Sequence, residues 1–165
     1  MTIFFASDHA GFTLKRNLIE YIHGLGFQAI DKGPFVYDES DDYPDFISLV
    51  AREVSRNPEA CRGIVIGGGG QGEAIVANRF PHVRAAVFYG PMAAQDAIDV
   101  KGQRSTDLFE NVRLSRTHND ANVLSIAARF VNEEDARHAV RIFLEIRFSG
   151  EERHARRIKK IDELK

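Results

Sequence analysis

The segment from Gly63 to Arg79 constrains the fold more than any other part of this 165-residue chain. It begins with a short apolar run, Gly63–Ile66, typical of a buried strand, and breaks at four consecutive glycines, Gly67–Gly70. Helix-forming residues resume at Glu73, so the segment predicts a strand, a tight turn and a helix, which together direct several backbone N–H groups toward one anion. The glycines could serve only the turn, and Glu73 could only cap the helix. Because four glycines in a row lose much chain entropy on folding, we favour a functional loop in which the Glu73 carboxylate transfers a proton.

Short apolar strands alternate with amphipathic helices along the rest of the chain. Strands are predicted over residues 2–7 and 27–31, from residue 63, and over 83–89 and 123–126. A first helix is predicted after residue 11, with apolar residues from Leu14 to Ile22 at helical spacing and an end near Gly24 and Gly26, and further helices are predicted over 43–55, 73–79 and 133–146. This alternation predicts an α/β fold in three layers, with helices on both faces of a doubly wound, parallel, five-stranded sheet. In such folds functional residues follow the carboxyl ends of strands, and the loops at 8–9 and 67–73 occupy two such ends, which face each other if their strands are neighbours.

Two segments exceed what a minimal sandwich of this kind needs. The connection 90–116 is long, as functional or mobile connections often are, and its later part, 106–116, is predicted to be a helix leading into His118. The tail, 149–165, is predicted to be a basic, extended C-terminal helix with Arg153 and Arg157 one turn apart on one face. It could be a solvated charged helix, or its arginines could bind an anionic ligand. No repeat or linker indicates a second domain, so we expect a single domain over residues 1–165.

Composition argues against several classes of protein. The chain is 44% hydrophobic, enough for a sizeable core, and its net charge of -2 gives no reason to expect a nucleic acid or an anionic membrane as a partner. The N-terminal residues lack the features of a signal peptide or a membrane span. The single cysteine, Cys61, cannot form an internal disulfide, which fits the cytoplasm. Because no metal-ligand spacing appears and no G-x-G-x-x-G follows the first strand, we expect neither a metal nor a dinucleotide.

Four polar groups remain to be explained: Asp8–His9, the glycine loop with Glu73, His118–Asn119 and the arginines of the tail. Taken singly, Asp8 could only cap the first helix, and His118 could be a surface residue. At loop positions of a doubly wound fold, we interpret the four groups as one site. A carboxylate base, backbone N–H donors, a histidine and several arginines suit the aldose–ketose isomerisation of a sugar phosphate, which moves a proton between adjacent carbons through an enediolate.

The same segments resemble the motifs of the ribose-5-phosphate isomerase B family, which also contains galactose- and allose-phosphate isomerases. The matching segments are Ala6–Phe12, Asp42–Asp45, Gly63–Arg79, His118–Asn122 and Arg153–Arg157. They occur in the family's order and extend over nearly the whole chain. The resemblance implies a flavodoxin-like (Rossmann-like) fold without a cofactor, and a homodimer or homotetramer whose active sites lie between subunits.

The resemblance also implies roles for individual residues. In one branch of the family the base is a cysteine at the position of Gly67, and in a second branch it is a glutamate at the position of Glu73, which we therefore assign as the base. By similarity, His118 opens the sugar ring and Asp8 orients the sugar hydroxyls. The resemblance implies that phosphate is bound by His9, Arg129, Arg153 and Arg157, and that the sugar is bound by Tyr43 and Asn119. The substrate-binding residues of the loop are Gly69, Gly70, Gln71 and Gly72. The N–H groups of Gly70, Gln71 and Gly72 hold the enediolate.

Two features depart from the family pattern. Gly69 stands where relatives usually place Ser or Thr, whose hydroxyl relays a proton between the sugar oxygens. The connection from residue 84 to 118 is about twice the length expected for the family, and it could cover the pocket or the dimer interface and change the size of the substrate. We expect a ribose-5-phosphate/ribulose-5-phosphate isomerase. The alternatives are an isomerase of a six-carbon sugar phosphate, such as allose or galactose 6-phosphate, and a non-catalytic protein that binds sugar phosphates.

Overall fold

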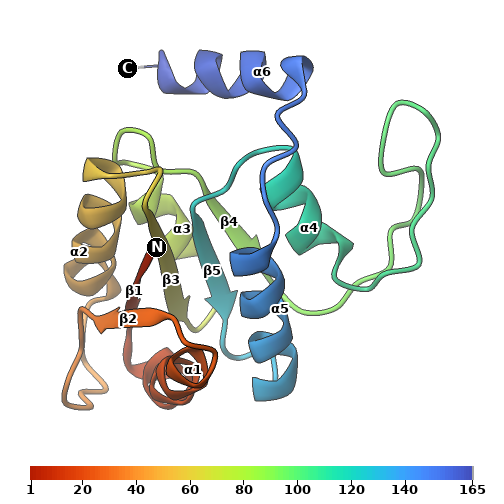
Figure 1. Ribbon diagram of the computed structural model, residues 1–165. Helices are drawn as coiled ribbons and strands as arrows, with labels where there is room; N and C mark the ends of the chain where they lie inside the picture. The colour runs from red at the N-terminus through yellow and green to blue at the C-terminus, as the bar shows by residue number, and fades with distance from the viewer. Residues whose placement is uncertain (165) are drawn as a thin grey trace.

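The computed structural model describes residues 1–164, and its centre is a parallel sheet of five strands in the order β2-β1-β3-β5-β4 (Figure 1). The strands are β1 (Thr2–Ser7), β2 (Gln28–Asp31), β3 (Cys61–Gly67), β4 (Ala85–Phe88) and β5 (Val123–Ala127). β1 pairs with both β2 and β3, and Ser7 is opposite Ile66 near the carboxyl ends of their strands. This register confirms that the loops following β1 and β3 are neighbours.

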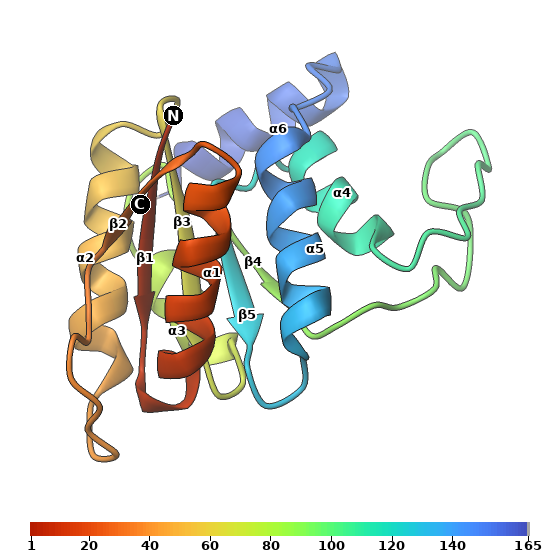
Figure 2. The same ribbon diagram turned by 60° about the horizontal axis from the view of Figure 1, so that its bottom comes forward.

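Helices cover both faces of the sheet, so the molecule has three layers (Figure 2). The helices are α1 (Phe12–Gly24), α2 (Tyr43–Arg56), α3 (Gln71–Ala77), α4 (Glu110–Thr117), α5 (Glu133–Glu145) and α6 (Glu152–Asp162). Side chains of α1, α4 and α5 share one hydrophobic core with the sheet, including Leu18, Val112 and Phe143. Side chains of α2 and α3, including Val50 and Ala77, share a second core on the other face. The predicted doubly wound α/β architecture is confirmed.

The buried strand β3 explains why its sequence contains no alternation of polar and apolar residues. Ile64, Val65 and Ile66 have no exposed surface, because consecutive side chains enter the cores on opposite faces of the sheet. Ile64 and Ile66 belong to the core under α1 and α5, whereas Val65 belongs to the core under α2. A continuous apolar run is therefore what a central parallel strand requires.

The predicted boundaries need correction at four elements. β3 begins two residues earlier, at Cys61, which already pairs with β1. β4 is shorter than predicted and extends only where it pairs with β5. α3 begins earlier, at Gln71, because Gly70 adopts the left-handed conformation (φ 71°) and starts the helix directly after the turn. α4 begins later, at Glu110, because the Asp107 carboxylate holds a separate turn before the helix.

The C-terminal helix α6 packs at the amino edge of the sheet (Figure 1). Its last residue, Asp162, lies 3.7 Å from His82 and 3.6 Å from Arg84, two residues that precede β4. The predicted tail helix is confirmed over 152–162, while Lys165, the end of the predicted 149–165 helix, lies outside the described residues. No helix within residues 1–164 has both the length and the apolar character needed to cross a membrane.

Candidate active site

The side chain of Glu73 is buried at the carboxyl end of β3. Glu73 lies in the first turn of α3 and is only 4% exposed. Its carboxyl group lies so close to Gly67 that a Cβ atom on residue 67 would overlap it. Burial raises the pKa of Glu73 above the ordinary value of 4.5, and the charge of Asp8 adds to this, whereas the backbone N–H groups of Glu73 and Gly70 oppose it. A carboxyl group with a raised pKa, placed beside N–H donors, suits proton transfer near neutral pH.

Two more side chains approach the glycine loop where glycine leaves room for them. The guanidinium of Arg129 lies over Gly68, since a Cβ atom on residue 68 would be 3.0 Å from its Cζ atom. The Arg129 N–H also donates to the Gly68 carbonyl at 3.2 Å. The Tyr43 ring lies against Gly72, where a Cβ atom would be 2.8 Å from the ring. Residue 69 differs from both, because a Cβ atom on Gly69 would meet nothing within 4 Å.

Asp8 and His9 follow β1 and complete this group of side chains. The Asp8 carboxylate accepts the Gly11 N–H at 3.1 Å, so Asp8 does cap the short helix that follows, and it also places a charge near Glu73. His9 Nδ1 lies 2.7 Å from the Asp41 carboxylate, which also accepts the His9 backbone N–H at 3.0 Å. This hydrogen bond raises the pKa of His9 above 6.5 and favours the imidazolium. The sequence did not identify Asp41, whose only signal is its place in an acidic run before α2.

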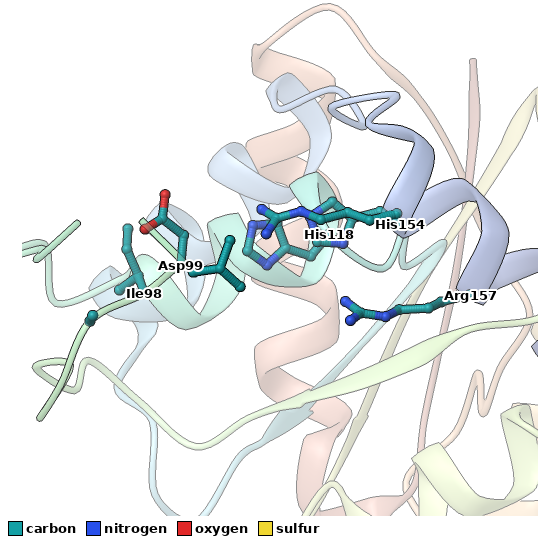
Figure 3. A pocket seen from close by; sticks show the side chains of 8 residues that line it. Ile98, Asp99, His118, His154 and Arg157 are labelled. Carbon is teal, nitrogen blue, oxygen red and sulfur yellow. The ribbon is translucent and has the colours of Figure 1, made fainter. Parts of the chain in front are cut away.

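The remaining predicted residues lie at the amino edge of the sheet. His118 caps the C-terminus of α4, and its ring stacks on that of His154 with 4.1 Å between ring centroids and an interplanar angle of 15°. Arg157 projects from α6 beside this pair (Figure 3), and Arg153 of the same helix also lines the space. Together with residues 97–100, these four side chains line a pocket of about 300 Å³. The guanidinium groups of Arg153 and Arg157 give this pocket positive charge that suits an anion.

His154 is a further component of this pocket that the sequence did not single out. It is 4% exposed, and its Nε2 atom finds no hydrogen-bond partner among the described residues. Burial, followed by the proximity of His118, lowers the pKa of His154 below 6.5, so its ring is neutral at pH 7. A buried neutral ring gives His118 a fixed surface on which to stack. Its place between the tail arginines is the only sequence signal.

The structure thus divides the predicted site between two edges of the sheet. The carboxyl edge carries Asp8, His9, Tyr43, Gly69, Gly70, Gln71, Gly72, Glu73 and Arg129, and the amino edge carries His118, Asn119, Arg153 and Arg157. The four polar groups interpreted as one site therefore do not meet within one chain, and this separation is compatible with the expectation that the active sites lie between subunits. His118 and Asn119 precede β5, whereas Asp8 and Glu73 follow β1 and β3, and in a parallel sheet these positions lie at opposite edges. We call these two groups of candidate residues the half-sites of the chain.

The two half-sites have complementary chemistry. The carboxyl edge holds the buried Glu73 carboxyl group, the backbone N–H groups of the glycine loop, and the side chains of His9 and Arg129, a set that could serve proton transfer and stabilise an oxyanion. The amino edge holds a histidine and an arginine pair that can bind an anion. Within residues 1–164, no cluster of three or more His, Cys, Asp or Glu side chains is arranged to hold a metal ion.

Comparison with known proteins gives relatives that extend over nearly the whole chain. The model of the Ribose/Galactose Isomerase family matches residues 3–104 and 105–161. Probable ribose-5-phosphate isomerase B of Mycoplasma genitalium is 38% identical over 159 residues, which are 96% of this chain and 92% of that protein. Ribose-5-phosphate isomerase B of Escherichia coli is 36% identical over 159 residues, which are 96% of this chain and 93% of that protein.

Solved structures agree with this result. The crystal structure of ribose-5-phosphate isomerase B from Mycoplasma genitalium with bound ribulose-5-phosphate matches with a TM-score of 0.84 and 37% identity, covering 98% of this chain and 93% of that chain. The structure of a ribose 5-phosphate isomerase from Thermotoga maritima matches with a TM-score of 0.81 and 37% identity, covering 99% of this chain and 98% of that chain. The resemblance seen in the sequence motifs is confirmed, and the chain belongs to the Ribose/Galactose Isomerase family.

Proposed function

We propose that this chain is an aldose–ketose isomerase that interconverts ribose 5-phosphate and ribulose 5-phosphate through an enediolate. The observation that carries the proposal is the buried Glu73 carboxyl group, held against Gly67 at the edge of a loop of backbone N–H groups. Relatives with this activity in their names, one of them with ribulose-5-phosphate bound, support the choice of substrate.

The proton transfer begins with ionised Glu73. Its carboxylate takes the proton from C2 of the open-chain aldose, which leaves an enediolate with a double bond between C1 and C2. Glu73 then returns the proton to C1, and the ketose carbonyl forms at C2. The N–H groups of Gly70, Gln71 and Gly72 hold the negative oxygen while it forms. Because Gly69 has no hydroxyl group, the proton that moves between the two sugar oxygens is carried by Glu73 or by water.

Binding and ring opening use both half-sites. His9, Arg129, Arg153 and Arg157 bind the phosphate, while Tyr43, Asn119 and Asp8 contact the sugar hydroxyls. His118 transfers the proton that opens the furanose ring. The distance between the two edges of one sheet supports a site assembled from two subunits, in which His118 and the tail arginines serve the neighbouring chain's Glu73. We therefore propose a homodimer or homotetramer, located in the cytoplasm, in keeping with the single unpaired Cys61.

The Glu73→Gln variant tests the assignment of the base. The amide cannot accept the proton, so kcat should fall by about 10²–10⁴-fold, while binding of ribose 5-phosphate persists. Incorporation of solvent deuterium into the substrate should fall with it. The matched control is Glu20→Gln, which makes the same change on the exposed surface of α1 and should have wild-type kcat. Wild-type turnover in Glu73→Gln would disprove the assignment, and absence of deuterium exchange in the wild type would indicate a non-catalytic sugar-phosphate-binding protein.

Subunit mixing tests the shared site. Glu73→Gln and His118→Asn chains should each be inactive alone, because every site in either homo-oligomer lacks one group. In a mixed dimer, one site combines both substitutions and the other has neither. Equal mixing should therefore restore about one quarter of wild-type activity, since about half of the dimers are mixed and each has one intact site. Activity that stays at the sum of the separate variants would refute a site built from two chains.

A further inference from the structure

The connection between β4 and α4, residues 89–109, forms a long loop that projects from the body of the protein and returns to it (Figures 1 and 2). We call this loop the excursion. Its base is closed by a backbone hydrogen bond from the Met92 N–H to the Leu108 carbonyl, at 2.7 Å. Farther out, the Ile98 N–H donates to the Gln103 carbonyl, also at 2.7 Å. These two backbone hydrogen bonds join the outgoing and returning halves of the excursion. The match to the family model is divided inside it, after residue 104.

The outer part of the excursion lines the pocket at the amino edge. Residues 97–100 form one side of the pocket, opposite the stacked histidines and the tail arginines. Figure 3 shows Ile98 and Asp99 on that side, with the guanidinium of Arg157 pointing into the space between them and α6. At about 300 Å³, the pocket is at the small end of the range for ligand sites. The excursion therefore forms a wall of the half-site that holds His118.

Hydrogen bonds within the excursion fix the local conformation of this wall. The Asp99 carboxylate accepts the backbone N–H groups of Lys101 and Gln103, both at 2.9 Å. These N–H groups also lower the pKa of Asp99, so the carboxylate is charged and the hydrogen bonds persist at neutral pH. This turn gives residues 97–100 a defined conformation on their side of the pocket.

We propose that residues 97–100 set the length of the sugar phosphate that the site accepts, favouring five-carbon over six-carbon substrates. This inference rests on the proposed function, in which Arg153 and Arg157 bind the phosphate and His118 acts on the ring. When the reacting carbons are held at Glu73, a six-carbon substrate extends one carbon–carbon bond farther toward the wall. Beside the Asp99 carboxylate, the wall presents the apolar side chains of Ile98 and Val100. Apolar contacts of this kind distinguish substrates that differ by one methylene group by about 10–200-fold in kcat/KM.

The test is the ratio of kcat/KM for allose 6-phosphate to that for ribose 5-phosphate. In the Ile98→Ala/Val100→Ala variant, which removes both branched side chains of the wall, this ratio should rise about 10-fold. The matched control is Met92→Ala/Leu108→Ala, which shortens two exposed side chains of the same connection that do not line the pocket and should leave the ratio unchanged. A second variant, with residues 94–104 replaced by Gly-Ser-Gly, should raise the ratio at least as much.

Three results separate this inference from the proposed function. An unchanged ratio in both wall variants would overturn the inference. Light scattering that shows dissociation of the variant with residues 94–104 replaced would also overturn it, since the excursion would then serve contacts between subunits. A wild-type protein that binds both sugar phosphates but isomerises neither would refute the proposed function alone. In that case the dissociation constants from calorimetry test the wall, because its removal should strengthen allose 6-phosphate binding about 10-fold relative to ribose 5-phosphate.

Discussion

A single methyl group added at residue 67 tests the geometry of the proposed base. In the Gly67→Ala variant, the new Cβ atom would overlap Oε1 and Cδ of Glu73 and lie 2.9 Å from its Cγ atom. Ordinary van der Waals contact begins at 3.4 Å, so the whole carboxyl group has to move. The displacement exceeds about 1 Å, and misplacement of a reacting group by that distance can reduce the rate about 100-fold. We therefore expect kcat/KM for ribose 5-phosphate to fall about 100-fold.

The assay is the steady-state rate of ribulose 5-phosphate formation, with thermal unfolding measured in parallel to show that the variant is folded. Gly24→Ala adds the same methyl group at the end of α1, where it meets nothing within 4 Å, and should leave kcat/KM unchanged. Gly69→Ala adds it in the same loop but in open space, and should reduce kcat/KM much less than Gly67→Ala. If Gly67→Ala and Gly69→Ala lose the same factor, the position of the Glu73 carboxyl group does not control the rate, and the reasoning is refuted.

Three other substitutions test separate parts of the structure. In Asp41→Asn, the pKa of His9 should fall, because the hydrogen bond to Asp41 is what raises it above 6.5. The imidazolium is the form that attracts phosphate, so the KM for ribose 5-phosphate should begin to rise at a lower pH than in the wild type. The kcat should be nearly unchanged. Identical profiles of KM against pH in the two proteins would contradict this expectation. Gly69→Ser should have a kcat about 10-fold above that of Gly69→Ala, because the site has room for a hydroxyl that carries a proton; equal rates would argue against such a relay. Lys15→Met should lower the free energy of unfolding in urea by about 2–4 kcal/mol, because the fully buried Nζ atom bonds the Asp31 carboxylate and a backbone carbonyl, both at 2.7 Å; an unchanged urea midpoint would contradict this.

The layered fold could be predicted because it depends on local patterns. Each strand is a short apolar run and each core helix has apolar residues at helical spacing, so the alternation alone determines a parallel sheet with two covered faces. The predicted boundaries were wrong where a single residue decides them. The start of α3 depends on the left-handed conformation of Gly70, and the start of α4 depends on the hydrogen bond accepted by the Asp107 side chain. Neither feature has a periodic signal in the sequence.

Parts of the candidate site's arrangement could be predicted from the sequence. The strand pattern placed the loops after β1 and β3 side by side, and the family resemblance implied sites between subunits. Loop position and side-chain chemistry made Glu73 and His118 candidates, and their separation within one chain follows from the strand that each one precedes or follows. Asp41 was missed because its partner, His9, is 32 positions away in the chain. His154 was missed because its contribution is a ring stack between α4 and α6, which only the packing of the two helices creates.

Gly67 and Glu73 are best understood as one coupled pair. The family resemblance offers two bases, a cysteine at residue 67 or a glutamate at residue 73, and in this structure the two exclude each other. Any side chain at residue 67 would begin in the volume that the Glu73 carboxyl group fills. Either base would therefore present its reactive atoms to the same point beside the N–H groups of the loop, and one chemistry would persist while the residue that performs it changes. If Glu73 is the base, as we propose, the glycine at residue 67 is a requirement for that base rather than the loss of a cysteine.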